Sequence, residues 1–301
     1  TTVHCGVPQG GSLSALLFSV YINDLMVRNS DTVSYVGYAD DVGLMFRFKK
    51  TINWRIIEQH VSDVFCWATE NGLLLNPSKS NYMVFGRFRL QQRPPIKIHV
   101  ASCGQAFSCD CPAILAVLET RYLGVMLDEK LSWKTHISHL CGRLRAATAT
   151  IMKLRRVVNS ETLIAIYKAL FEAQLRYCIT AYGSAFYSTL EPIVKIQNAL
   201  IKKMLRRRDT ETLEDLYGKS NIRPFKLLYL ECLAMEALIR NPVSTARLVS
   251  EHVPSHSYDT RNTYNINPPL TRLRRTDKQH HYRYLTLLRD HKRELEMIDE
   301  L

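Results

Sequence analysis

The chain has 301 residues, of which 46% are hydrophobic and 23% charged, a composition typical of a globular protein with two or three domains. No uncharged apolar run reaches transmembrane length, which excludes a predicted membrane-spanning helix. The formal net charge is +12, and residues 131–208 carry 14 Lys and Arg against 3 Asp and Glu, whereas residues 1–130 and 209–301 are nearly balanced. This segment indicates a surface for a polyanion, with a solvated face of a helical bundle as the open alternative.

Residues 12–26 are the first predicted helix, and the Gly-rich loop GVPQGG precedes them. Apolar residues recur at three- and four-residue steps and predict one apolar face: Leu13, Leu16, Leu17, Val20, Ile22 and Leu25. Ser12 is suited to cap the start of this helix. The chain begins with TTVHCGVPQG, without Met or a signal-peptide pattern, and we interpret it as starting within a longer protein.

The stretch SYVGYADDVGLM predicts a β-hairpin with Asp40 and Asp41 side by side at its tip. Strand-forming residues flank the pair on both sides, although an isolated Asp pair more often marks an exposed turn. Because aspartate in apolar surroundings needs a partner or a metal, we expect the pair to be buried. Carboxylates suit Mg²⁺, and two-metal phosphoryl transfer uses such a pair. Neighbouring strand residues point to opposite faces, so one Asp should dominate the site.

Short elements are predicted between this hairpin and residue 130. Residues 56–71 predict a helix that Gly72 ends. Residues 82–85, 97–100, 113–117 and 122–128 predict strands. From Trp133 onward the pattern is helical: a regular apolar stripe runs to residue 154, and helices follow over residues 161–177 and 190–207, in a pair over 211–240, and in a polar segment over 278–299.

Cysteine and histidine occur in two groups. One contains His99, Cys103, Cys109 and Cys111, and the other contains His136, His139 and Cys141. Zinc sites favour paired ligands two to four residues apart, which these spacings fit poorly. Free thiols are therefore the expected state, as for the 8 cysteines generally.

Five blocks lie in a recognisable order: GVPQGGSLSALLFSVYINDL, YADD, NGLLLNPSKSNYMVFGR, RYLGVMLDEKLSWKTHI and LRRVVNSETLIAIYKALFEAQLRYCITAYGSA. This set resembles the reverse transcriptase family, specifically its non-LTR (LINE-type) retrotransposon branch, over about residues 1–210. The resemblance implies an α+β fold. Residues 1–130 would form part of a right-hand palm, with helices packed on an antiparallel sheet. Residues 131–208 would form a basic helical thumb, and residues 209–301 a helical extension with a loosely ordered tail.

The resemblance also implies a role for each candidate residue. Asp40 and Asp41 would bind the catalytic metals, and Lys79 would act on the triphosphate and pyrophosphate, although a solvated lysine is the alternative. Template and nucleotide would pass Gln9, Gly10, Gly11 and Ser12. Tyr122, Leu123 and Gly124 would form the primer grip, with core packing of Tyr122 as the alternative. The nucleic-acid backbone would contact Lys153, Arg155, Arg156, Lys202, Lys203, Arg206, Arg207 and Arg208.

A chain of this family would use Mg²⁺ and bind an RNA template, a DNA primer, dNTPs and the element's own RNA. It would act in the nucleus and cytoplasm and would not bind a membrane. The family places a further catalytic Asp before the GVPQG loop, and neither Asp24 nor Asp31 matches that position. We therefore expect residues 1–301 to be inactive alone. Two alternatives remain open: a group II intron maturase-like reverse transcriptase, and a non-enzymatic nucleic-acid-binding remnant.

Overall fold

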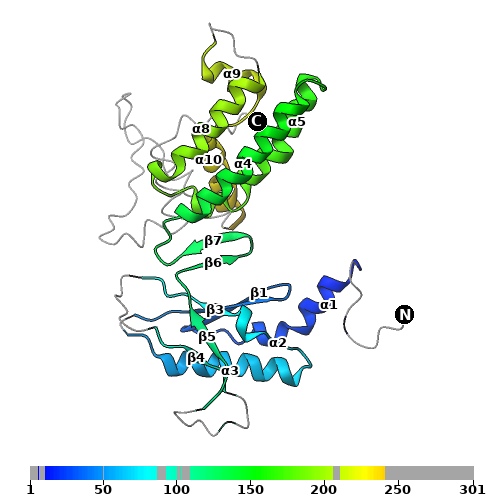
Figure 1. Ribbon diagram of the computed structural model, residues 1–301. Coiled ribbons are helices and arrows are strands. Elements are labelled where there is room, and N and C mark those ends of the chain that lie inside the picture. The colour runs from blue at the N-terminus through cyan, green and yellow to red at the C-terminus, as the bar shows by residue number, and fades with distance from the viewer. Residues whose placement is uncertain are drawn as a thin grey trace, which may run out of the picture. The chain divides into compact units, whose positions relative to one another are not determined.

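The computed structural model describes residue 6, residues 11–49, 51–86 and 93–99, residue 103, and residues 109–205 and 211–240. The chain divides into two compact units, Thr1–Thr120 and Arg121–Leu301. Helices and small sheets both occur (Figure 1), as expected for the α+β class. Within the described ranges, no helix has both the length and the apolar character needed to cross a membrane.

The helices of the first unit are α1 (Ser14–Tyr21), α2 (Asn23–Met26) and α3 (Trp54–Glu70). The predicted continuous helix over residues 12–26 is therefore interrupted at Ile22. Helix α3 begins where the Asn53 side chain accepts a hydrogen bond from the Ile56 N–H. It ends as predicted, because Gly72 has a φ of 70° and Leu73 N–H bonds back to the carbonyl of Ala68.

Two small sheets accompany these helices. Strands β1 (Val33–Tyr38) and β2 (Asp41–Phe46) form the predicted antiparallel hairpin. Strands β3 (Asn81–Tyr82), β4 (Ile96–Lys97) and β5 (Ala113–Ala116) form a second sheet in the order β3–β5–β4. The expected single antiparallel sheet is thus wrong: the hairpin forms its own sheet, and β3 pairs with β5 in parallel. The predicted strand over residues 82–85 is reduced to the two residues of β3.

Helix α3 packs against both sheets because it is amphipathic on a broad face. Toward the hairpin, its residues join a cluster of Ile22, Leu25, Val33, Tyr35, Val64, Trp67 and Ala68. On the side of the other sheet, Ile57 and Val61 of α3 form a second cluster with Ile96, Ile98 and Ile114. The two clusters fix the hairpin and the β4–β5 pair on one helix.

A hairpin spans the start of the second unit, which continues as helices. Strands β6 (Glu119–Tyr122) and β7 (Val125–Asp128) pair around a turn at Leu123 and Gly124, so the predicted single strand over residues 122–128 is wrong. The helices are α4 (Lys134–Leu154), α5 (Ser160–Tyr167), the π-helical turn η2 (Lys168–Glu172), α6 (Ala173–Arg176), α7 (Ile179–Tyr182), α8 (Tyr187–Met204), α9 (Leu213–Ser220) and α10 (Phe225–Arg240). The predicted stripe of α4 is buried, including Ile137, Leu140, Leu144 and Ile151.

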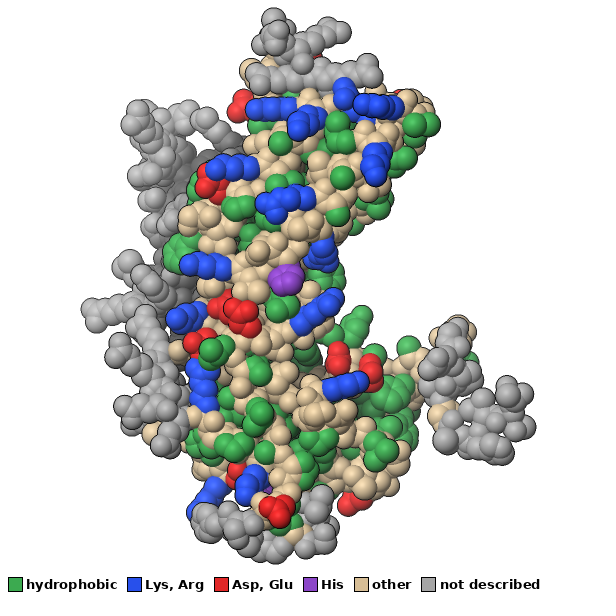
Figure 2. Space-filling view, viewed as in Figure 1, with side chains coloured by type: hydrophobic (Ala, Val, Ile, Leu, Met, Phe, Trp, Pro, Cys, Tyr) green, Lys and Arg blue, Asp and Glu red, His purple; other side chains and the backbone are tan. Residues whose placement is uncertain are grey.

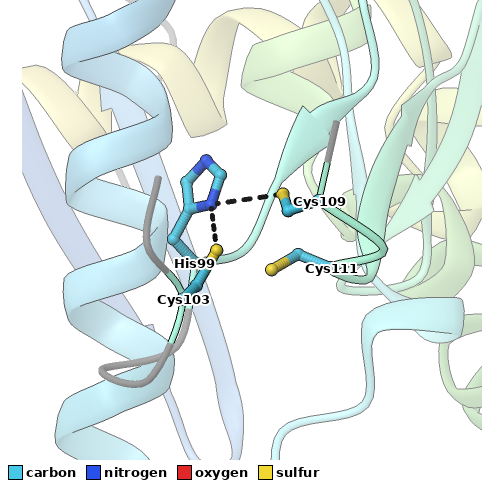
Figure 3. Close-up of side chains that lie close together, drawn as sticks. All are labelled: His99, Cys103, Cys109 and Cys111. Atoms are coloured by element: carbon cyan, nitrogen blue, oxygen red, sulfur yellow. Dashed lines mark hydrogen bonds between the residues drawn. The ribbon is translucent and has the colours of Figure 1, made fainter. Parts of the chain in front are cut away.

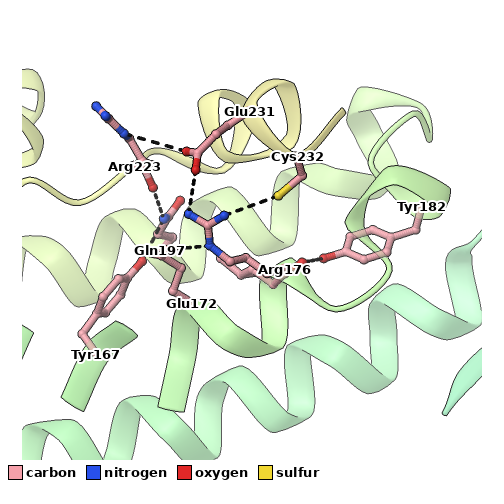
Figure 4. Close-up of polar contacts among 9 residues, drawn as sticks. Tyr167, Glu172, Arg176, Tyr182, Gln197, Arg223, Glu231 and Cys232 are labelled. Carbon is pink, nitrogen blue, oxygen red and sulfur yellow. Dashed lines mark hydrogen bonds and ion pairs between the residues drawn. The ribbon is translucent and has the colours of Figure 1, made fainter. Parts of the chain in front are cut away.

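Residues 211–240 share one core with the helices before them. Leu216, Tyr217, Ile222, Phe225 and Leu228 belong to the same hydrophobic cluster as α4, α5 and α8. The fully buried side chain of Gln197 on α8 connects these helices through hydrogen bonds. Its amide donates to the Tyr167 hydroxyl and to the Arg223 carbonyl, each at 2.9 Å (Figure 4). Its oxygen accepts from Phe225 N–H at 2.8 Å. With every polar atom of its amide bonded, this glutamine can stay buried.

Candidate functional site

The paired aspartates lie at the tip of the β1–β2 hairpin. Tyr38 pairs with Asp41, so Ala39 and Asp40 form a two-residue loop, with Ala39 at a φ of 50°. Both aspartates are exposed, and the prediction that they are buried is wrong. An exposed tip hydrates the two charges, which removes the cost that burial would bring.

The pleat of the hairpin separates its two faces. Val33 and Tyr35 on β1 are buried against the helices, whereas Val36, Tyr38 and Met45 are exposed. Alternation and the cross-strand register place Asp41 on that open face, with its partner Tyr38. Asp40 precedes the strand in the loop. The two carboxylates are therefore adjacent at an open edge, and neither forms an ion pair with any other described residue.

Asp24 serves a structural role near this hairpin. Its carboxylate accepts a hydrogen bond from the indole N–H of Trp67 at 3.0 Å, and Trp67 belongs to the core under the hairpin. This bond holds α2 against α3. Asp24 is therefore occupied within the helical layer and does not complete a group of three acidic residues with the hairpin pair in the described part of the chain.

The segment before the hairpin differs from the prediction in two respects. Helix α1 begins at Ser14, its N-cap is Leu13, and no side chain caps it, so Ser12 is not the capping residue. Gly11 and Ser12 are exposed, while Gln9 and Gly10 lie outside the described residues. The apolar face predicted for this helix is mostly exposed rather than buried, at Leu13, Leu16, Leu17 and Val20.

Lys79 lies in a short 3₁₀ turn, η1 (Pro77–Lys79). The Asn76 side chain shapes the turn by accepting hydrogen bonds from the N–H and hydroxyl of Ser78, at 3.0 and 2.7 Å. The Lys79 side chain is exposed and forms no ion pair with Asp40 or Asp41 within the described residues. The ammonium group of Lys79 is therefore accessible to solvent and is not in contact with the carboxylates of Asp40 and Asp41.

The turn between β6 and β7 is well fixed. Leu123 and Gly124 have φ values of 45° and 78°, as a two-residue type I′ hairpin turn requires. The Tyr177 hydroxyl donates to the Leu123 carbonyl. Tyr122 and Leu123 are half-buried and Gly124 is exposed, so Gly124 is the part of this turn that is open to solvent.

Asp128 joins this hairpin to helix α4. Its carboxylate accepts hydrogen bonds from the N–H groups of Lys130, Ser132 and Trp133 at 3.0–3.1 Å. Burial opposes ionisation of Asp128, but these N–H donors outweigh it, and the net effect lowers its pKa. The charged carboxylate thereby fixes the chain at the start of α4.

Exposed basic side chains line the helices of the second unit (Figure 2). On α4 they are Lys134, Arg143, Arg145 and Lys153; Arg156 follows that helix, and Lys202 and Lys203 end α8. None of them forms an ion pair with another described residue, whereas Lys195 and Lys219 pair with Glu191 and Glu211 at 2.9 and 2.7 Å. Arg155 is half-buried, and Arg206, Arg207 and Arg208 lie outside the described residues. Unpaired surface cations of this kind suit phosphate groups.

The first Cys/His group forms a cluster that its spacing did not suggest. The ligand atoms of His99, Cys103, Cys109 and Cys111 all lie within 4.8 Å of one another (Figure 3). The signal in the sequence was indirect, since only the pairing of β4 with β5 brings the two ends of the group together. The N–H of Cys111 lowers the pKa of the Cys109 thiol. Hydrogen bonds with the sulfurs of Cys103 and Cys109 raise the pKa of the Cys111 thiol to about 11.

The second Cys/His group does not cluster. His136 and Cys141 are buried in α4, and His139 is exposed. The imidazole of His136 packs against the ring of Tyr182, with centroids 5.0 Å apart. Its Nδ1 accepts from Met126 N–H at 3.4 Å. Burial lowers the pKa of His136, and this residue serves as part of the core.

Known proteins resemble this chain. Residues 1–127 match the family described as reverse transcriptase (RNA-dependent DNA polymerase). The chain is 27% identical over 297 residues to the RNA-directed DNA polymerase from mobile element jockey of Drosophila melanogaster, covering 93% of this chain and 29% of that protein. It is 28% identical over 210 residues to the probable RNA-directed DNA polymerase from transposon X-element of the same species, covering 66% and 22%. The jockey protein of Drosophila funebris is 25% identical over 225 residues, covering 69% and 23%.

This chain therefore spans about a quarter of the length of these curated relatives. No solved structure gives a significant match to it.

Proposed function

We propose that this chain, whose residues 1–127 match the reverse transcriptase family, is part of the RNA-directed DNA polymerase of a non-LTR retrotransposon. The observation that carries the proposal is the position of Asp40 and Asp41 at the open tip of a hairpin within those residues. The relatives named above come from mobile elements, which favours this function over that of an intron maturase or a binding remnant.

In this proposal the first unit is part of a polymerase palm. Helices α2 and α3 cover the inner face of the β1–β2 hairpin through the core around Leu25 and Trp67. The opposite face carries exposed Val36, Tyr38 and Met45 and remains accessible to a substrate. A rigid hairpin with one covered and one open face holds two carboxylates at a fixed edge.

The hairpin pair fits Mg²⁺ as a partial ligand set. Both carboxylates are exposed and unpaired among the described residues, and Mg²⁺ in phosphoryl-transfer sites takes one or two carboxylates plus water and substrate oxygens. Bound Mg²⁺ would supply the charge that stabilises the transferring phosphoryl group. Asp40 and Asp41 would hold it, and a further carboxylate would come from outside the described residues, because Asp24 is bonded to Trp67.

Other residues of the first unit would position the nucleotide. The exposed ammonium of Lys79, on the short turn η1, would meet the negative charge of the triphosphate and protonate the leaving pyrophosphate. Gly11 and Ser12, with Gln9 and Gly10 before them, would lie along the template base and the incoming nucleotide. The small side chains in this segment permit close approach of the backbone.

The second unit would act as the thumb. Its β6–β7 turn offers Tyr122, Leu123 and Gly124 to the primer backbone, and Tyr177 stiffens that turn. The unpaired cations on α4 and at the end of α8, together with Arg206, Arg207 and Arg208, would contact phosphates of the template–primer duplex without reading its sequence. RNA template, DNA primer and dNTPs are the proposed substrates.

A chimeric polymerase tests this function. Residues 1–301 would replace the corresponding segment of the jockey RNA-directed DNA polymerase, which would supply the remainder of its own chain. Mg²⁺-dependent extension of a DNA primer on an RNA template is the expected result, because the segment would complete the catalytic carboxylates. A soluble, folded chimera that binds the template–primer duplex but never extends it, while the parent does, would contradict the proposal.

A further inference from the structure

Four soft ligand groups meet beside the β4–β5 pair in the first unit. The Nδ1 atom of His99 lies 3.5 Å from the sulfur of Cys103 and 3.6 Å from that of Cys109. The sulfur of Cys111 completes a set whose atoms are all within 4.8 Å of one another. Around tetrahedral zinc, a nitrogen and a sulfur ligand are about 3.6 Å apart and two sulfur ligands about 3.8 Å apart. The observed separations already approach that geometry.

Strand pairing explains why residues so unevenly spaced converge. Ile96 pairs with Ile114 and Lys97 with Ala113, and Ile98 N–H extends the ladder by bonding to the Pro112 carbonyl at 2.8 Å. Continuing this antiparallel register sets His99 across from Cys111. Cys103 and Cys109 belong to the connection between the two strands. His99 and Cys111 at its two ends therefore meet Cys103 and Cys109 from its interior.

Helix α3 fixes the backbone of His99 from the other side. His99 N–H donates to the Ser62 hydroxyl at 2.9 Å, and the Cys66 thiol donates to the His99 carbonyl at 3.8 Å. Both partners lie on α3, which is itself packed on β4. One ligand is thereby oriented by a rigid helix before any ion binds, which is the kind of support that metal ligands require.

We propose that His99, Cys103, Cys109 and Cys111 bind one zinc ion in a structural site. Three thiolates and an imidazole are soft donors that select Zn²⁺ over the hard cation Mg²⁺. Four protein ligands fill a tetrahedral shell and leave no open position for water or substrate, so the site is structural rather than catalytic. It is separate from the hairpin aspartates and does not depend on the proposed polymerase activity.

Lys97 supplies the charge that such a site needs. Three thiolates around Zn²⁺ leave one net negative charge. The ammonium of Lys97 lies 3.8 Å from the Cys109 sulfur and donates to the Cys109 carbonyl at 2.9 Å. A cation at this position offsets the excess charge and holds the Cys109 backbone near the ion.

Metal analysis of the reduced full chain provides the first test. The protein would be purified with a phosphine reductant, dialysed without chelator, and its zinc, iron and copper measured by mass spectrometry. One equivalent of zinc per chain is expected. Replacing zinc by Co²⁺ should give the thiolate charge-transfer absorption and the intense visible bands of tetrahedral cobalt. Both readouts use the unmodified chain, so neither depends on whether a variant folds.

Matched cysteine variants locate the ion. Cys109→Ser combined with Cys111→Ser should reduce the zinc content from one equivalent to nearly none. Cys66→Ser should keep it, because a serine hydroxyl can still donate to the His99 carbonyl that the Cys66 thiol contacts, and Cys178→Ser, in the second unit, should keep it too. His99→Cys should retain the ion and shift the cobalt spectrum, since a thiolate replaces the imidazole, whereas His99→Ala should bind zinc at least about tenfold more weakly.

Three outcomes would overturn the proposal. One is reduced, folded chain that binds no zinc even after addition of one equivalent. Another is zinc that remains at full stoichiometry in the Cys109→Ser/Cys111→Ser variant. The third is a disulfide within this group that persists under the reducing conditions of the purification, because it would consume the ligands.

Discussion

The hydroxyl of Tyr177 donates a hydrogen bond to the carbonyl oxygen of Leu123, and its ring faces Gly124. Tyr177 follows helix α6, and Leu123 begins the β6–β7 turn. The contact links residues 54 positions apart and attaches the turn proposed as the primer grip to the helices of the second unit. The shape of this turn therefore depends on both its own backbone and that helix end.

Gly124→Ala should destabilise the second unit by about 1–2 kcal/mol, because Gly124 has a φ of 78° that an L residue adopts only with strain. Space is available, since an added Cβ would lie 3.6 Å from the Tyr177 ring. Gly142→Ala, within α4 with nothing within 4 Å of its Cβ, should instead stabilise by about 0.5–1 kcal/mol. Urea unfolding followed by circular dichroism measures both changes, and equal signs would contradict this account of the turn.

Arg176→Ala should destabilise the second unit by about 2 kcal/mol, because it leaves the charge of Glu172 without its partner. The guanidinium contacts Glu172 at 2.9 Å and Glu231 at 3.1 Å (Figure 4), and only 8% of the Glu172 side chain is exposed. Lys195→Ala is the control, since the Lys195–Glu191 pair is largely exposed and its loss should cost under about 0.5 kcal/mol. If thermal denaturation shows no difference between the two variants, the Arg176 network contributes no more than a surface pair.

Asp128→Asn should weaken the second unit at neutral pH by about 1–2 kcal/mol, because the amide cannot replace a carboxylate that accepts three backbone N–H bonds. The pKa of Asp128 is lowered in the folded chain. Its stabilising effect is therefore complete above the unfolded pKa of about 3.9 and is lost as the pH falls through the lower folded value. Urea unfolding at neutral and acidic pH measures this.

The difference between wild type and Asp128→Asn should shrink as the solution becomes more acidic. Asp31→Asn serves as the control, because Asp31 is exposed and its carboxylate accepts no hydrogen bond from any described residue. A gap between Asp128→Asn and wild type that stays constant from neutral to strongly acidic pH would contradict a role for the charged carboxylate.

Replacing Lys202 and Lys203 of α8, together with the three arginines that follow that helix in the sequence, with Gln should weaken duplex binding and flatten the dependence of log K on log salt concentration. Each lost phosphate contact should reduce the slope by about 0.9. The control replaces Lys195 and Lys219, whose charges are already paired with Glu191 and Glu211. Fluorescence anisotropy at several salt concentrations checks this, and unchanged slopes would reduce the cluster to a solvated surface. The replaced residues are Lys202, Lys203, Arg206, Arg207 and Arg208.

The sequence predicts the elements whose periodicity is long or whose boundaries carry a strong signal. The stripe of α4, the end of α3 at Gly72 and the β1–β2 hairpin are confirmed. Local pattern fails where tertiary pairing decides. Periodicity cannot show that the predicted helix over residues 12–26 breaks at Ile22, or that strands β3 and β5 pair in parallel.

The candidate site shows the same division. The tip position of Asp40 and Asp41 follows from strand propensity on both sides. The prediction that they are buried was wrong, because Asp40 lies in the exposed two-residue loop and Asp41 lies on the open face of β2. The sequence identifies the group of His99, Cys103, Cys109 and Cys111, but its spacing does not predict that the four side chains converge, because strand pairing brings them together. Spacing rules for zinc describe single loops and do not detect ligands gathered by strand pairing.

The proposed function requires that the carboxylates of Asp40 and Asp41 support nucleotidyl transfer. The most direct measurement is primer extension on an RNA template by the jockey chimera, compared with its Asp40→Asn, Asp41→Asn and Asp31→Asn variants over a range of Mg²⁺ concentrations. Asp40→Asn should lower the rate by at least about 10²–10³-fold, Asp41→Asn should lower it less, and Asp31→Asn should leave it unchanged. Residues 1–301 without the jockey segment should give no extension. Full activity of the Asp40→Asn and Asp41→Asn chimeras, or extension by residues 1–301 alone, would contradict this role of the two carboxylates.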